Sequence, residues 1–281
     1  MGARLLLLAA LVATPAGDAV VWKPGFGRAP LWNDGQAEVS IYEATDVKYG
    51  RPRASRAVLI VVAEDLLADK LVKADDPGGA ARTRRVLKLN HVRSIPTGFY
   101  TYQQMLSVFA GADRLEPVKL TMTSHEWCGN SFVEWRSDRG TLEIRSYFET
   151  PGDVDLRLEP NEAVFYDALP LALRGLDFER TRAGSLRVID TLFTSKPMVP
   201  SVEEARLEVE RPAGTSGVYR VRLSRGDHRD TFEFERAFPH RLARWDRSDG
   251  SSLRLQRSLR SRYWEKTAPG DERLLVSPGT P

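Results

Sequence analysis

The sequence predicts an all-β protein, built as an antiparallel meander that forms a barrel, a half-barrel or two curved sheets. About a dozen short segments show the alternating or continuous apolar pattern of strands. Clusters of Gly, Pro, Asn, Asp and Ser separate these segments, as turn residues do. The strands do not alternate with helical segments, so the pattern excludes the parallel α/β classes. One or two short helices near residues 160–178 are the expected exception.

Strand patterns begin at residue 37 and continue for about 120 residues. The segment "AVLIVVAE" (57–64) is a continuous β-branched run, typical of a strand covered on both faces. The segment "GRPRASR" (50–56) is expected to be a turn, because Gly50 and Pro52 interrupt the pattern. The segment "RSDRG" (136–140) is expected to close a hairpin. The strands predicted in this part are 37–50, 57–64, 85–92, 96–111, 116–127, 130–135 and 141–149.

The pattern changes at residues 159–178. The apolar residues at helical spacing are Val164, Phe165, Ala168, Leu169 and Ala172. Pro170 interrupts them, which predicts one or two short helices and not a long one. Beyond them the predicted strands are 184–193, 204–211, 217–224 and 230–237, with two or three more in 239–264.

These patterns divide the chain into five segments. Residues 20–158 form an N-terminal β unit, 159–180 a helical connection, 181–266 a C-terminal β unit and 267–281 a loose tail. Residues 1–19 have the layout of a signal peptide, with Arg4 before the apolar run 5–12 and small residues after it. Cleavage is expected after Ala16 or Ala19, which predicts a periplasmic or secreted protein.

The composition excludes several classes of partner and attachment. Lys and Arg number 41 against 38 Asp and Glu, a small excess that does not predict nucleic-acid binding. No apolar run reaches the roughly 18 residues of a membrane span, and no cysteine near the cleavage site offers a lipid attachment point. The single cysteine, Cys128, excludes an internal disulfide.

Cys128 raises the question of catalysis. A cysteine nucleophile requires a lowered thiol pKa and an oriented base, and the candidate bases are His125 and His91. In an extended strand, residues three apart face opposite sides, so His125 meets Cys128 only if this segment turns. The other interpretation is a small packed cysteine beside Trp127. No residue is assigned a catalytic role.

No metal or cofactor is expected. The four histidines, His91, His125, His228 and His240, do not pair at metal-ligand spacing, and no cysteine cluster supports them. Phosphate-loop, dinucleotide and GxSxG patterns are absent from the sequence.

Aromatic residues indicate an apolar ligand. A curved sheet of this size can hold one on its concave face. The residues expected to bind it are Tyr100, Tyr102, Trp127 and Trp135.

The segment "VLKLNHVRSIPTGFYTYQQMLSVFA" (86–110), followed by "TSHEWCGNSF" (123–132), resembles a group of secreted bacterial proteins of uncharacterised function. Members of that group are sometimes labelled septum formation inhibitor Maf. Maf proteins resemble cytoplasmic α/β nucleotide pyrophosphatases, whereas this chain starts with an export signal and has an all-β pattern. The resemblance, over most of residues 32–175, implies export and a shared fold, and no catalytic residue follows from it.

Together these observations favour a non-catalytic exported β-protein. Its expected partner is a lipid or other apolar ligand, or a protein of the cell envelope. A hydrolase or transferase that uses Cys128 with His125 or His91 is the alternative.

Overall fold

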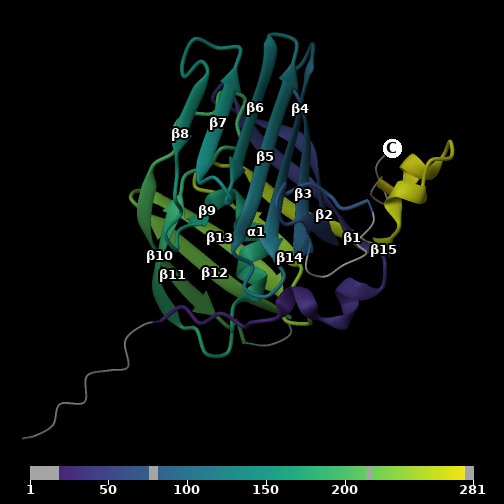
Figure 1. The fold of residues 1–281 in the computed structure, drawn as a ribbon, viewed down its shortest axis with the longest axis vertical. Helices are drawn as coiled ribbons and strands as arrows, with labels where there is room; N and C mark the ends of the chain where they lie inside the picture. The colour runs from purple at the N-terminus through teal and green to yellow at the C-terminus, as the bar shows by residue number, and fades with distance from the viewer. Residues whose placement is uncertain (1–18, 76–81, 214–216, 276–281) are drawn as a thin grey trace, which may run out of the picture.

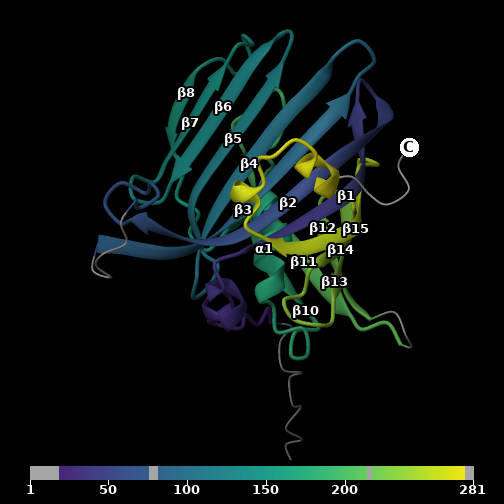
Figure 2. The same cartoon turned by 90° about the vertical axis from the view of Figure 1, so that its right-hand side faces the viewer.

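The fold is that of a computed structural model, which describes residues 19–75, 82–213 and 217–275. The expected signal peptide lies outside these residues except for Ala19, and so does the end of the expected tail. Fifteen strands form one curved sheet that does not close (Figures 1 and 2). The predicted all-β class is therefore confirmed.

Two strand meanders make up the sheet. The first contains β1 (Ala37–Lys48), β2 (Arg51–Leu67), β3 (Thr83–Pro96), β4 (Thr101–Gly111), β5 (Pro117–Glu126), β6 (Gly129–Arg136), β7 (Thr141–Ser146) and β8 (Val154–Arg157). The second contains β9 (Val164–Phe165), β10 (Ala183–Ile189), β11 (Val202–Glu210), β12 (Val218–Arg225), β13 (His228–Glu235), β14 (Leu242–Asp246) and β15 (Ser252–Ser261). Strands β1 and β15 pair antiparallel and join the meanders, which leaves β8 and β9 at the two edges. The edge strand β9 departs from the predicted antiparallel meander, because it pairs parallel with β10.

The hairpin between β1 and β2 is tighter than expected. Its turn is Tyr49 and Gly50 alone, both with positive φ, as two-residue hairpin turns require. The expectation of a turn over residues 50–56 was therefore wrong beyond Gly50. Pro52 lies in β2 opposite Val47, at the end of the hairpin, where a missing backbone N–H disturbs the ladder least.

Both faces of β2 are covered, as its continuous apolar run predicts. Ala57, Leu59 and Val61 belong to the main core on the concave side. Val58 and Ile60 pack into a small outer cluster. The C-terminal segment, with the 3-10 turns η6 (Tyr263–Glu265) and η7 (Asp271–Leu275), borders the groove over that cluster.

The concave side is filled by a short helical segment, which we call the plug. It consists of η4 (Tyr166–Ala168), α1 (Leu169–Ala172) and η5 (Leu173–Gly175), and it confirms the helices predicted near 160–178. Figure 1 shows α1 in front of the strands of the second meander. Three leucines of the plug, Leu169, Leu171 and Leu173, are at most 1% exposed. Burial of each stabilises the fold by about 1.5–3 kcal/mol.

The N-terminal segment passes beneath the plug. Trp22 forms a β-bridge with Leu176, and two 3-10 turns, η1 (Phe26–Arg28) and η2 (Pro30–Asn33), follow before β1 begins. No helix among the described residues has both the length and the apolar character needed to cross a membrane.

A buried ion pair ties the plug to β1. Arg174 donates from Nη1 to Glu38 Oε1 over 2.9 Å and from Nη2 to Oε2 over 3.0 Å. Its Nε donates to the carbonyl of Pro239 at 2.9 Å. The two side chains are only 3% and 5% exposed, so little solvent screens their attraction.

Replacing Arg174 with Met is expected to lower the free energy of unfolding by about 3–5 kcal/mol, because Glu38 keeps a buried charge without its partner. Urea denaturation followed by circular dichroism measures this change. The double variant Glu38→Met/Arg174→Met should recover part of the loss. Arg157→Met, which breaks an exposed pair with Glu159, serves as the control and should cost less than about 1 kcal/mol. Equal losses for the buried and exposed sites would contradict the anchoring role.

Candidate functional site

A cavity of about 670 Å³ lies between the plug and the part of the first meander around the β4–β5 turn and the end of β6. This volume falls within the range of small-molecule pockets. The main apolar side chains of its wall are Val108, Leu115, Trp135, Phe165, Ala172 and Leu186. They come from both meanders and from the plug, so the cavity exists only in the assembled sheet.

Charged side chains surround the cavity at the surface. They are Lys23, Arg114, Glu116, Glu159 and Glu162, all exposed. Three of them have partners of opposite charge: Lys23 lies 3.8 Å from Asp177, Glu116 2.8 Å from Arg84 and Glu159 2.8 Å from Arg157. An apolar interior with a rim of mixed charge suits a molecule with an apolar part and a polar part.

Trp135 holds one wall of the cavity in place. Its side chain is 1% exposed, and its indole N–H donates to the carbonyl of Leu158 at 2.9 Å. Its ring lies 5.0 Å from the ring of Phe165, measured between centroids. Trp135 thereby fixes the crossover between β8 and β9 against β6. Of the four residues predicted to bind a ligand, Trp135 is the one that lines this cavity.

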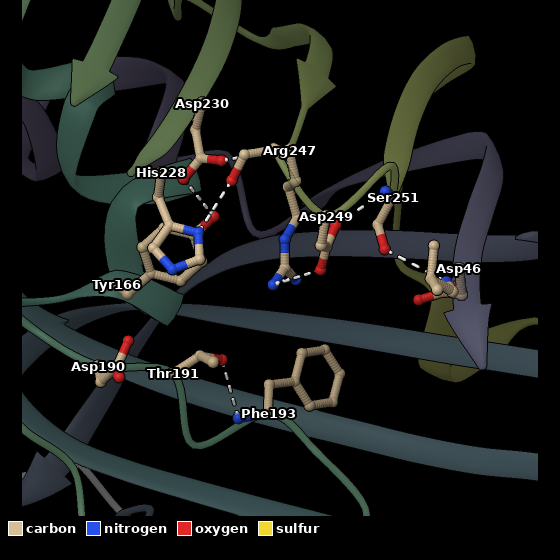
Figure 3. Close-up of polar contacts among 12 residues, drawn as sticks. Asp46, Tyr166, Asp190, Thr191, Phe193, His228, Asp230, Arg247, Asp249 and Ser251 are labelled. Carbon is tan, nitrogen blue, oxygen red and sulfur yellow. Dashed lines mark hydrogen bonds and ion pairs between the residues drawn. The ribbon is translucent and has the colours of Figure 1, made fainter. Parts of the chain in front are cut away.

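The residues from Phe165, the last of β9, to Ala168, the last of η4, face two different environments. Phe165 and Ala168 line the cavity. Tyr166 and Asp167, between them in the chain, make polar contacts on the other side. Tyr166 donates to Asp230 at 2.8 Å (Figure 3). Asp167 accepts from Thr191 Oγ1 at 2.6 Å.

The other three predicted ligand residues belong to a separate cluster, in which Trp127 is exposed and Tyr102 is buried. We call it the aromatic tip, and it consists of Tyr49, Phe99, Tyr100, Tyr102 and Trp127. These residues lie at or beside the turns β1–β2, β3–β4 and β5–β6. The cavity lies near the β4–β5 turn, which an antiparallel meander places at the opposite end of the strands. The sequence pattern predicted one site for all four residues. In the fold, Trp135 lines the cavity, whereas Tyr100, Tyr102 and Trp127 lie at the other end of the strands.

Cys128 is exposed and does not pack inside the sheet wall. The expectation of a packed cysteine was wrong, because Trp127 and Cys128 form the whole β5–β6 turn and project beyond the strands. A hydrogen bond with Glu126 and the negative charge of that carboxylate raise the pKa of the Cys128 thiol. An activated nucleophile requires the opposite shift.

The two candidate bases do not join Cys128. His125 is exposed, and its Nδ1 lies 2.6 Å from Asn130 Oδ1. His91 is 3% exposed in the interior and contacts the ring of Phe193. In the sheet register His91 is level with Met122, six residues before Cys128, a separation of about 20 Å along the strand.

Several cavity residues were not identified from the sequence. Trp22 and Leu115 come from segments with no strand or helix pattern of their own. The sequence predicted helical positions for Ala168 and Ala172, but nothing in it indicated that these small side chains border a cavity. Among the residues the structure describes, no group of three His, Cys, Asp or Glu side chains is placed to hold a metal ion.

Comparison with known proteins adds no relative: no family model, no curated protein and no solved structure matches the chain. The resemblance to exported bacterial proteins therefore stays a prediction.

Native Cys128 is expected to react slowly with iodoacetamide at pH 7, despite its exposure, because its raised pKa leaves little thiolate. The Glu126→Gln variant removes the charge that raises this pKa and should alkylate several-fold faster. Mass spectrometry of timed samples measures both rates, and Glu149→Gln, an exposed acid elsewhere, is the control. If Glu126→Gln reacts no faster than the wild type, Glu126 does not govern the thiol.

Stability is expected to fall as the pH decreases below 6.5. Burial, followed by the charges of Arg93 and Arg247, lowers the pKa of His91 well below its usual value. The unfolded chain therefore takes up a proton at His91 before the folded chain does, which favours unfolding. Burial raises the pKa of Asp167, which acts in the opposite direction, so the test compares two proteins that share Asp167.

Urea denaturation at pH 7.5 and 5.5 should show a smaller loss of stability for His91→Gln than for the wild type. His125→Gln, which removes an exposed imidazole, is the control. An identical loss in wild type and His91→Gln would contradict this assignment.

Proposed function

We propose that the protein binds an amphiphile outside the cytoplasm, with the apolar part of the ligand in the 670 Å³ cavity and the polar part at the charged rim. The cavity is the observation that carries this proposal. Of the two partners expected from the sequence, an apolar ligand or an envelope protein, the cavity favours the ligand. The extracytoplasmic location rests on the export pattern of residues 1–19.

The lining of the cavity supports this choice. Val108, Leu115 and Leu186 offer apolar surface without hydrogen-bonding groups, and the indole N–H of Trp135 is already bonded to Leu158. A polar ligand would lose its hydration there without compensation. The exposed rim, by contrast, leaves a head group in contact with water. Because the rim carries both charges, its electrostatics do not restrict the head group to one sign.

The cysteine-dependent alternative has weaker support. Cys128 has a raised pKa and lies apart from both His91 and the cavity. His125 is bonded to Asn130. A base for the thiol is thus missing among the candidates that the sequence offered.

The proposal is tested by titrating delipidated protein with 11-(dansylamino)undecanoic acid, a fluorescent amphiphile. The wild type should increase and blue-shift the dansyl emission as the probe enters an apolar site. Ala172→Phe, which adds a ring at the cavity wall, should weaken binding at least tenfold, or about 1.4 kcal/mol. Far-UV circular dichroism checks that the variant folds.

Ala268→Phe is the matched control. It makes the same change at an exposed position beside the outer groove under the C-terminal segment. It should leave the affinity unchanged. Loss of binding in Ala268→Phe with normal binding in Ala172→Phe would place the ligand in the outer groove and overturn the proposal, as would the absence of binding to the wild type.

A further inference from the structure

Buried nitrogen atoms without hydrogen-bond partners gather on the polar side of η4. Among the described residues, ten buried side-chain nitrogen or oxygen atoms have no partner. Five of these belong to one cluster, which we call the polar node: His91 Nε2, Arg93 Nε, Arg225 Nε, Trp245 Nε1 and Arg247 Nε. Each unsatisfied buried group costs about 1–3 kcal/mol, so such a concentration requires an explanation.

Ring contacts show that these side chains converge. Arg225 and Arg247 lie over the same ring, with Cζ at 4.5 and 5.4 Å from the centroid of Tyr166. That ring lies 5.7 Å from the ring of Trp245. On the other side, Arg93 Cζ lies 3.8 Å from the ring centroid of Phe193.

His91 connects the two groups. Its ring is 4.9 Å from the ring of Phe193 and 6.5 Å from that of Trp245. A small cavity of about 10 Å³ is bordered by His91, Arg93, Trp245 and Arg247, and also by the carboxylate of Asp46, which is paired with Arg93. This space accommodates one oxygen-sized atom.

The nearby carboxylates already have donors of their own. Asp46 accepts from Arg93 at 2.9 Å and from Ser55 at 2.6 Å. Asp167 accepts from Thr191 Oγ1 at 2.6 Å and from the Leu192 N–H at 2.7 Å.

Asp230 accepts from Tyr166 at 2.8 Å and from the Ser248 N–H at 2.9 Å. Figure 3 shows Asp230 beside Tyr166, and Arg247 beside Asp249, with which it forms an ion pair at 3.1 Å. One buried acceptor near the node lacks a partner, Gln104 Oε1, on β4 opposite Arg93. Unpaired donors therefore outnumber unpaired acceptors at this place.

We propose that the polar node binds an oxyanion group, a carboxylate or a phosphoryl group, one oxygen of which occupies the small cavity between Arg93, Trp245 and Arg247. Hydrogen bonds from arginine to an oxyanion are charge-assisted and stronger than neutral ones. The Arg247 side chain is 20% exposed and the Asp249 side chain 42%, so the remainder of the ligand extends toward solvent on that side.

The cationic side chains of the node contribute to lowered pKa values in neighbouring basic groups. Burial and then the charge of Arg93 lower the pKa of Lys48, whose ammonium group lies 4.8 Å from the ring centroid of Tyr102. The charges of Arg93 and Arg247 also contribute to the lowered pKa of His91. Arg93, Arg225 and Arg247 also pair with Asp46, Asp190 and Asp249, so the anion is held by the unpartnered donors and not by an excess of positive charge. The node lies across η4 from the apolar cavity, so this site is separate from the proposed amphiphile site.

The proposal is tested with sodium phosphate and sodium acetate at 20 mM and constant ionic strength, by measuring the midpoint of thermal unfolding. A ligand that binds only the folded state raises this midpoint. We expect a rise of about 2–4 °C for the wild type with at least one of the two anions. A rise with acetate alone identifies a carboxylate, a rise with phosphate alone identifies a phosphoryl group, and a rise with both identifies a general oxyanion site.

Variants separate the site from a general salt effect, which phosphate in particular exerts on folded proteins. Arg247→Met should lose at least half of the rise, whereas Arg244→Met, an exposed arginine of β14 paired with Asp246, should keep it. Trp245→Phe retains a ring but lacks the N–H, and it should also lose part of the rise. If Arg247→Met does not fold, the result for Trp245→Phe tests the proposal in its place. Equal rises in all proteins, or no rise in the wild type, would overturn the proposal.

Discussion

The ladder between β1 and β15 is the pairing on which the rest of the structure depends. It runs from Ala37 opposite Ser261 to Thr45 opposite Ser252, and it joins residues more than 200 positions apart in the chain. Without it the two meanders would be separate sheets, each with one more unpaired edge. Strand β1 also supplies Glu38, the partner of Arg174 in the plug, and Asp46, the partner of Arg93 in the polar node. One strand thus connects the sheet, the plug and the interior charges.

The plug divides the interior of the curved sheet. A sheet that curves but does not close leaves a concave face that must be filled, and the leucines of α1 and η5 fill it. From the end of β9 through η4, the change from Phe165 to Tyr166 and Asp167 and back to Ala168 directs apolar groups to one side and polar groups to the other. The apolar cavity and the polar node are therefore two sides of the same short segment. A displacement of η4 would alter both.

The fold class could be predicted because strands leave a local signal. The alternation in residues 141–149 identified β7, and the helical spacing of Val164 to Ala172 identified the plug. The contacts that build the sites leave no such signal. Arg174 and Glu38 are 136 positions apart, and Tyr166 and Asp230 are 64 apart.

Proximity in the sequence was misleading for the aromatic residues. Tyr100 and Tyr102 adjoin a different turn from Trp127, yet all three gather at one end of the sheet, because alternate turns of a meander lie at the same end. Trp135 is nearer to Trp127 in sequence than Tyr100 is, but it lies toward the opposite end of β6. The positions of residues along their strands, rather than their chemical type, decided which of them could share a site.

The position of a residue along its strand or in a loop also determines which parts of the cavity tolerate substitution. Its floor comes from Val108 and Trp135 in the sheet and from Ala172 in the plug, where a change in volume disturbs the core. Its rim comes from the β4–β5 turn, the crossover at 158–163 and the segment around Lys23, all of which are loops. Loops tolerate substitution better than strands. Selectivity for a head group can therefore change through rim residues such as Arg114 and Glu162 while the fold and the apolar floor remain intact.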